Sequence, residues 1–124
     1  MADRLSGKRI LVIEDEHFIA ADLQQVLEDE GAEVIGPTGN VTHGLDLATR
    51  AIDAALLDVN LEGVNSFPIA DLLTERAVPY VFLTGYDGRS LPEGYQAVPH
   101  LAKPFRMDAV VLALGLLLDD EAQG

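Results

Sequence analysis

Five polar residues follow short apolar segments of the sequence and could do chemistry together: Glu14, Asp15, Asp58, Thr84 and Lys103. Three carboxylates at one site repel one another, and they stay ionised together only with a cation between them. Oxygen ligands without cysteine favour a hard divalent ion, and Mg2+ fits best because it needs few protein ligands. A lysine and a hydroxyl beside such an ion suit an oxygen-rich anion such as a phosphoryl group. A carboxylate can itself be the nucleophile that accepts that group.

Apolar runs alternate with segments of helical periodicity, which predicts an α/β fold with a parallel sheet and helices on both faces. Strands are expected at Arg9–Ile13, Ala32–Ile35, Ala54–Leu57, Tyr80–Leu83 and Val98–Ala102. The second strand is expected to close at Gly36-Pro37, and Gly31 is the predicted C-cap of the first helix. Later helices are expected after a cap at Asn40 or Thr42, at Phe67–Arg76 and at Met107–Leu118. Three glycines and a proline in residues 85–97 predict that any fourth helix there is short or missing.

The carboxyl ends of parallel strands share one edge of a sheet, where functional residues gather. All five polar residues end predicted strands, so we expect them to converge. Each has a simpler interpretation on its own: Glu14-Asp15 as a solvated turn, Asp58 as a loop cap, and Thr84-Gly85 as a turn. Their joint placement favours a common site.

Composition narrows the class of protein. The 124 residues predict one domain, residues 1–124, with a core of about residues 8–118. With 21 acidic and 8 basic residues the net charge is −13, so nucleic acid is not expected as a ligand. We find no signal peptide, and the apolar run Ala109–Leu118 is too short for a membrane span. A cytoplasmic location is the default expectation.

Four stretches carry a resemblance to the response-regulator receiver domains of bacterial two-component signalling: Ile10–Glu16, Ala55–Gly63, Val81–Gly85 and Leu101–Phe105. The resemblance covers about Lys8 to Leu118. It implies the flavodoxin-like (βα)5 doubly wound fold with strand order 2-1-3-4-5.

The resemblance also implies a role for each matching residue. Asp58 would accept a phosphoryl group from a phosphohistidine of a histidine kinase or a histidine phosphotransfer protein. Thr84 and Lys103 would bind the phosphoryl oxygens, and Pro104 would follow a cis peptide bond. Mg2+ would be held by Glu14, Asp15, Asp58 and the backbone carbonyl of Asn60.

One segment, Pro79–Tyr86, is similar to the signature of the "FAT GUY" single-domain regulators, with Leu83 in place of the usual alanine. That subgroup is associated with stress-response phosphorelays and with histidine kinases of the HWE type. The family often has an aromatic switch residue three positions before the lysine, where this chain has His100. Tyr86, two positions after Thr84, is the expected substitute, and the simpler interpretation of His100 is a partly buried strand histidine.

The sequence thus predicts a stand-alone receiver that catalyses its own phosphorylation on Asp58. No output domain is expected after Leu118, where only a polar acidic tail follows, so the chain would signal by protein contacts or act as a phosphate sink. The alternative is a Mg2+-dependent phosphatase with an aspartyl-phosphate intermediate. A third interpretation, a receiver-like fold that only binds partners, would require lost site residues.

The last predicted helix has apolar residues on two opposite sides. Its sheet-facing side is predicted to carry Val110, Val111, Leu114, Leu117 and Leu118. Leu112 and Leu116 fall on the opposite side, which indicates either a partner or dimer surface or two scattered surface leucines.

Overall fold

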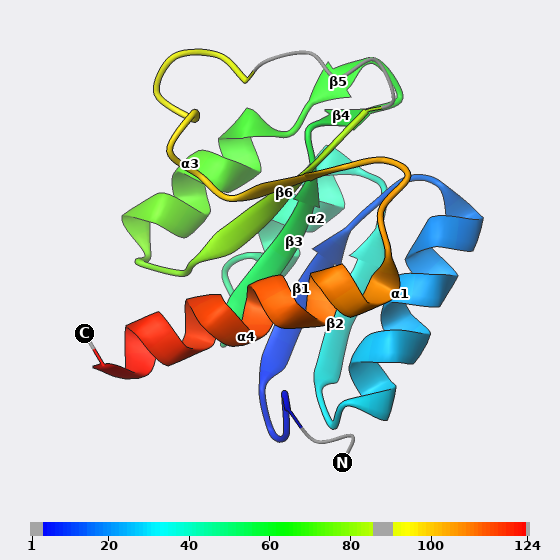
Figure 1. Ribbon diagram of the computed structural model, residues 1–124. Helices are drawn as coiled ribbons and strands as arrows, with labels where there is room; N and C mark the ends of the chain where they lie inside the picture. Colours follow the sequence, from blue (N-terminus) through cyan, green and yellow to red (C-terminus); the bar gives the residue numbers. More distant parts are fainter. Residues whose placement is uncertain (1–3, 86–90, 124) are drawn as a thin grey trace.

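A five-stranded parallel sheet forms the centre of the computed structural model, which describes residues 4–85 and 91–123 (Figure 1). The strand order is β2-β1-β3-β6-β7, which is the predicted flavodoxin-like order 2-1-3-4-5 once two short hairpin strands are set aside. The sheet strands are β1 (Arg9–Ile13), β2 (Glu33–Thr38), β3 (Ala54–Asp58), β6 (Tyr80–Thr84) and β7 (His100–Ala102).

Helices cover both faces of the sheet. The described residues form α1 (His17–Asp29), α2 (Val41–Leu47), α3 (Phe67–Glu75) and α4 (Met107–Gln123). In Figure 1, α1 and α4 lie on one face, and α2 and α3 lie on the other. Residues 91–99 form no helix, as expected for a short or missing fourth helix, and residues 86–90 lie outside the described part.

Alternating side chains of the central strands build two separate cores. In β1, Ile10 and Val12 pack with Leu23 of α1 and Leu114 of α4. The intervening Leu11 belongs to the second core, which contains residues of α2 and α3. A strand buried on both faces must be apolar throughout, which explains the continuous apolar runs of the sequence.

The last helix presents the predicted faces. Val110, Val111 and Leu114 are buried, whereas Leu112 and Leu116 are 51% and 57% exposed. The helix continues to Gln123, so its predicted end at Leu118 is wrong. No glycine or proline interrupts the sequence between Leu116 and Gly124, and the helical backbone continues accordingly.

Two predicted strand boundaries are also wrong by two residues or more. The second strand does not close at Gly36-Pro37 but continues to Thr38, because the Glu14 N–H donates to the Thr38 carbonyl at 2.9 Å and keeps the edge paired. A register shift in the pairing of β1 with β2 accommodates the glycine and proline. The fifth strand begins at His100 and not at Val98, because Pro99 has no N–H to donate to the ladder.

A hairpin that the sequence analysis did not predict follows β3. It consists of β4 (Asn60–Leu61) and β5 (Val64–Asn65), joined by Glu62 and Gly63. Both turn residues have positive φ, 53° and 87°, as a two-residue hairpin turn requires. The hairpin lies beside the carboxyl ends of the strands (Figure 1).

The described part of the chain contains no helix that is long and apolar enough to cross a membrane.

Candidate functional site

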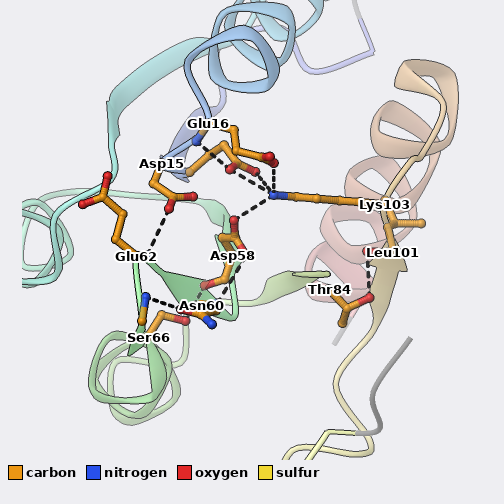
Figure 2. A network of polar contacts seen from close by, with 11 residues as sticks. Asp15, Glu16, Asp58, Asn60, Glu62, Ser66, Thr84, Leu101 and Lys103 are labelled. Carbon is orange, nitrogen blue, oxygen red and sulfur yellow. Dashed lines mark hydrogen bonds and ion pairs between the residues drawn. The ribbon is translucent and has the colours of Figure 1, made fainter. Parts of the chain in front are cut away.

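The acids and the lysine predicted from three strand ends meet at the carboxyl edge of the sheet (Figure 2). Glu14 and Asp15 follow β1, and Asp58 is the last residue of β3. One oxygen from each of these three carboxylates lies within 4.8 Å of the other two. Adjacent parallel strands therefore place the three acids in one cluster.

Lys103, directly after β7, provides the positive charge at the centre of this cluster. Its Nζ lies 2.9 Å from Asp58 Oδ2 and 3.0 Å from Glu14 Oε1. It also contacts Glu16 Oε2 at 2.7 Å. The lysine is buried, and the peptide bond between Lys103 and Pro104 is cis.

Asp58 is oriented by the hairpin segment that follows it. The Asn60 N–H donates to Asp58 Oδ1 at 3.3 Å, and the buried Ser66 hydroxyl donates to the main-chain carbonyl of Asp58. Lys103 contacts the other carboxylate oxygen, so both oxygens of Asp58 have a polar partner. Asp15 is fixed by the same hairpin, because the Glu62 N–H donates to its Oδ2 at 3.0 Å (Figure 2).

Burial shifts the protonation of these acids. It raises the pKa of Glu14 from 4.5 to about 8, and the hydrogen bond from the Glu16 N–H offsets this only in part. Burial also raises the pKa of Asp58, although the hydrogen bond with Lys103 acts in the opposite direction. Burial lowers the pKa of Lys103, but its hydrogen bonds to Glu16, Asp58 and Glu14 outweigh that effect, so its net shift is upward. The single positive charge of Lys103 therefore does not compensate for the burial of the carboxylates, and the pKa values of Glu14 and Asp58 stay raised.

The donor atoms suit a hard divalent cation. Glu14 Oε1 is buried without a hydrogen bond, although it forms an ion pair with Lys103. The cluster offers only oxygens, which is the ligand type of Mg2+. The three clustered carboxylates, all of them oxygen ligands, therefore fit Mg2+.

Thr84 ends β6 at the same edge but does not contact the acids. Its hydroxyl donates to the Leu101 carbonyl at 3.4 Å, and its own carbonyl accepts from the Lys103 N–H at 3.0 Å. His100 is exposed at the start of β7, so its interpretation as a partly buried histidine is wrong. It lies on an edge strand, where one flank faces solvent. Tyr86 lies outside the described residues.

Sequence reasoning assigned no role to Glu16, Ser66 or Glu62, which all contact the site. Glu16 continues the acidic run at the end of β1, which was the available signal. Ser66 acts through its hydroxyl, and Glu62 acts through its backbone N–H in a hairpin that shows no alternation of apolar residues. No sequence pattern predicts such contacts.

The fold and this site define a class: the chain belongs to the response regulator receiver domain family, whose model matches residues 10–115. It is 30% identical over 122 residues to the transcriptional regulatory protein PdtaR of Mycobacterium tuberculosis, covering 93% of this chain and 58% of PdtaR. It is 36% identical over 103 residues to the phyllosphere-induced regulator PhyR of Methylorubrum extorquens, covering 78% of this chain and 38% of PhyR.

Among solved structures, SdrG from Sphingomonas melonis Fr1 matches with a TM-score of 0.78 at 40% identity, covering 93% of this chain and 98% of SdrG. The chain spans 58% and 38% of the lengths of PdtaR and PhyR, respectively.

Proposed function

We propose that Asp58 accepts a phosphoryl group from a phosphohistidine of a histidine kinase or histidine phosphotransfer protein. The observation that carries the proposal is the arrangement around Asp58: a buried carboxylate with two further acids within 4.8 Å and the Lys103 ammonium at 2.9 Å. Membership of the receiver family supports the same assignment. We favour it over the phosphatase alternative because that class usually has its nucleophile within Asp-x-Asp after the first strand, where this chain has Glu14-Asp15-Glu16.

Glu14, Asp15, Asp58 and the Asn60 carbonyl would hold Mg2+, which supplies positive charge for the oxygens of the incoming group. Asp58 then acts as the nucleophile: a bond forms between its carboxylate oxygen and phosphorus as the bond from phosphorus to the histidine nitrogen breaks. Lys103 is already in contact with Asp58 and would pair with a phosphoryl oxygen. Thr84 would exchange its 3.4 Å hydrogen bond to Leu101 for one to a phosphoryl oxygen.

The movement of Thr84 supplies the proposed signal. Tyr86, two positions further on, follows the threonine and changes position with it, whereas His100 contributes less. A ring with two positions converts a small shift at Asp58 into a change of the surface. The output is a protein contact or the draining of phosphoryl groups from a shared relay.

The wider context of the proposal is a stand-alone cytoplasmic receiver in a stress-response phosphorelay, served by a kinase of the HWE type. The resemblance of Pro79–Tyr86 to the single-domain regulators supports this context. The likeness to SdrG, of which the match covers 98%, supports only the stand-alone form. Leu112 and Leu116, exposed on α4, would form a dimer surface.

The test is to incubate the protein with Mg2+ and acetyl phosphate and to measure its intact mass. Wild-type protein should gain one phosphoryl group, and EDTA should prevent the gain. An Asp58→Ala variant that still gains the phosphoryl mass would overturn the proposal.

A further inference from the structure

Asp15 is held between two segments that lie outside β1. On one side the Glu62 N–H of the hairpin turn donates to Asp15 Oδ2 at 3.0 Å. On the other side Gly39, between β2 and α2, approaches the main chain of Asp15. A Cβ atom at Gly39 would lie 2.6 Å from Asp15 Cα and 2.8 Å from Asp15 Cβ, closer than carbon atoms pack.

Gly39 is needed for space and not for its backbone conformation. Its φ lies outside the left-handed region, unlike that of Gly36 or Gly63, so alanine could adopt the same backbone. The three atoms nearest to an added Cβ all belong to Asp15. A side chain at position 39 would therefore act on Asp15 directly.

The segment that carries Gly39 is anchored at both ends. Before it, the Thr38 carbonyl accepts from the Glu14 N–H at 2.9 Å. After it, Asn40 caps α2, because its Oδ1 accepts from the His43 N–H at 2.8 Å. Thr38 Oγ1 also contacts His43 Nδ1 at 3.0 Å. Because this segment is tied to β1 and to α2, the displacement caused by an added methyl group falls on Asp15.

We infer that Gly39 is a positioning residue for the cation site: together with the Glu62 N–H it fixes where the Asp15 carboxylate lies. This inference rests on the proposed function, because it requires Asp15 to bind Mg2+. Mutation of residues that hydrogen-bond to metal ligands typically lowers metal affinity by about 10-fold to 100-fold, and a direct displacement of Asp15 should act on the ligand at least as strongly. A Gly39→Ala variant should remain folded and bind Mg2+ about 10-fold more weakly or worse.

The experiment measures Mg2+ affinity by isothermal titration calorimetry and stability by urea unfolding in EDTA. Two glycines provide matched controls. A Cβ at Gly44 would meet Ile69 Cδ1 at 2.7 Å and Ile13 Cδ1 at 3.1 Å. Both atoms are the ends of core side chains and not main-chain atoms of the site, so Gly44→Ala should lower stability without weakening Mg2+ binding. A Cβ at Gly115 meets nothing within 4 Å, so Gly115→Ala should also leave Mg2+ affinity unchanged.

Wild-type affinity in Gly39→Ala would overturn the positioning role, and so would an equal loss of affinity in Gly44→Ala. If wild-type protein binds no Mg2+, the proposed function itself fails. If Gly39→Ala does not fold, Gly63→Ala tests the other side of Asp15: its Cβ meets nothing within 4 Å, but the φ of 87° strains the turn that carries the Glu62 N–H. Unchanged affinity in that variant would contradict the inference.

Discussion

Lys103 Nζ lies 2.9 Å from Asp58 Oδ2, although 45 positions of the chain separate the two residues. Lys103 directly follows β7, the edge strand of the sheet, whereas Asp58 is the last residue of the central strand β3. Their contact therefore depends on the pairing of β3, β6 and β7, and it ties the Asp58 carboxylate to the stability of the fold.

Replacing Lys103 by methionine should destabilise the metal-free protein. The change leaves Asp58 buried without its cation, and breaking a buried ion pair typically costs about 3–5 kcal/mol. Urea unfolding in EDTA measures the loss. Arg106→Gln, which removes an exposed pair with Asp108, is the control and should change little. Equal stability of Lys103→Met and wild type would contradict the central role of the lysine.

Replacing Glu14 by glutamine should stabilise the metal-free protein at neutral pH. The folded-state pKa of Glu14, about 8, lies above its ordinary 4.5, so the folded protein retains a proton that the unfolded chain has lost. Wild-type stability then falls as pH rises from about 4.5 to 8, and the variant lacks this decline. The gain at pH 7 is about 1–3 kcal/mol.

Urea unfolding in EDTA between pH 4.5 and 8 gives the difference between Glu14→Gln and wild type. The difference should grow with pH, and a constant or shrinking difference would refute the raised pKa. Added Mg2+ should stabilise wild-type protein more than the variant, because the variant has lost a cation ligand. Glu75→Gln is the control, since Glu75 is an exposed residue at the end of α3.

The exposed leucines of α4 should affect association and not folding. Leu112→Glu and Leu116→Glu alter side chains that are 51% and 57% exposed, so unfolding midpoints should stay close to wild type. Leu114→Ala, at a fully buried position of the same helix, should cost about 2–5 kcal/mol. Light scattering with and without phosphorylation should show a dimer that the glutamate variants lose. A wild-type monomer in both states would exclude this surface as a dimer interface.

Tyr86→Ala should keep phosphorylation of Asp58 but alter partner binding, whereas His100→Ala should do less. His100 is exposed on an edge strand, which leaves its ring no enclosed space to exchange with a moving threonine. The affinities of phosphorylated Tyr86→Ala and phosphorylated His100→Ala for the partner show which of the two residues transmits the signal. Uncoupling by His100→Ala alone would show that the assignment is wrong.

The sheet was predictable because burial on both faces leaves a clear mark on a sequence. Within β1, β3 and β6 a continuous apolar run ends where a polar residue begins, so both the strands and the acids at their ends could be located. The strand order came from the resemblance to receivers, since parallel register depends on contacts distant in sequence.

What could not be predicted depends on backbone contacts. The hairpin after β3 has only two residues in each strand, too few for a periodic signal. The contact between Gly39 and Asp15 joins two loops, and nothing in the sequence distinguishes a glycine needed for space from one needed for a positive φ. The continuation of β2 through Pro37 likewise depends on the Glu14 N–H, which tertiary structure supplies.

Locating the phosphoryl group tests the central claim most directly. Protein phosphorylated with Mg2+ and a phosphodonor is reduced with borohydride, which converts an aspartyl phosphate to homoserine, and its peptides are then sequenced by mass spectrometry. We predict homoserine at position 58 alone. Modification at Asp15 or another acid, with Asp58 intact, would contradict the account.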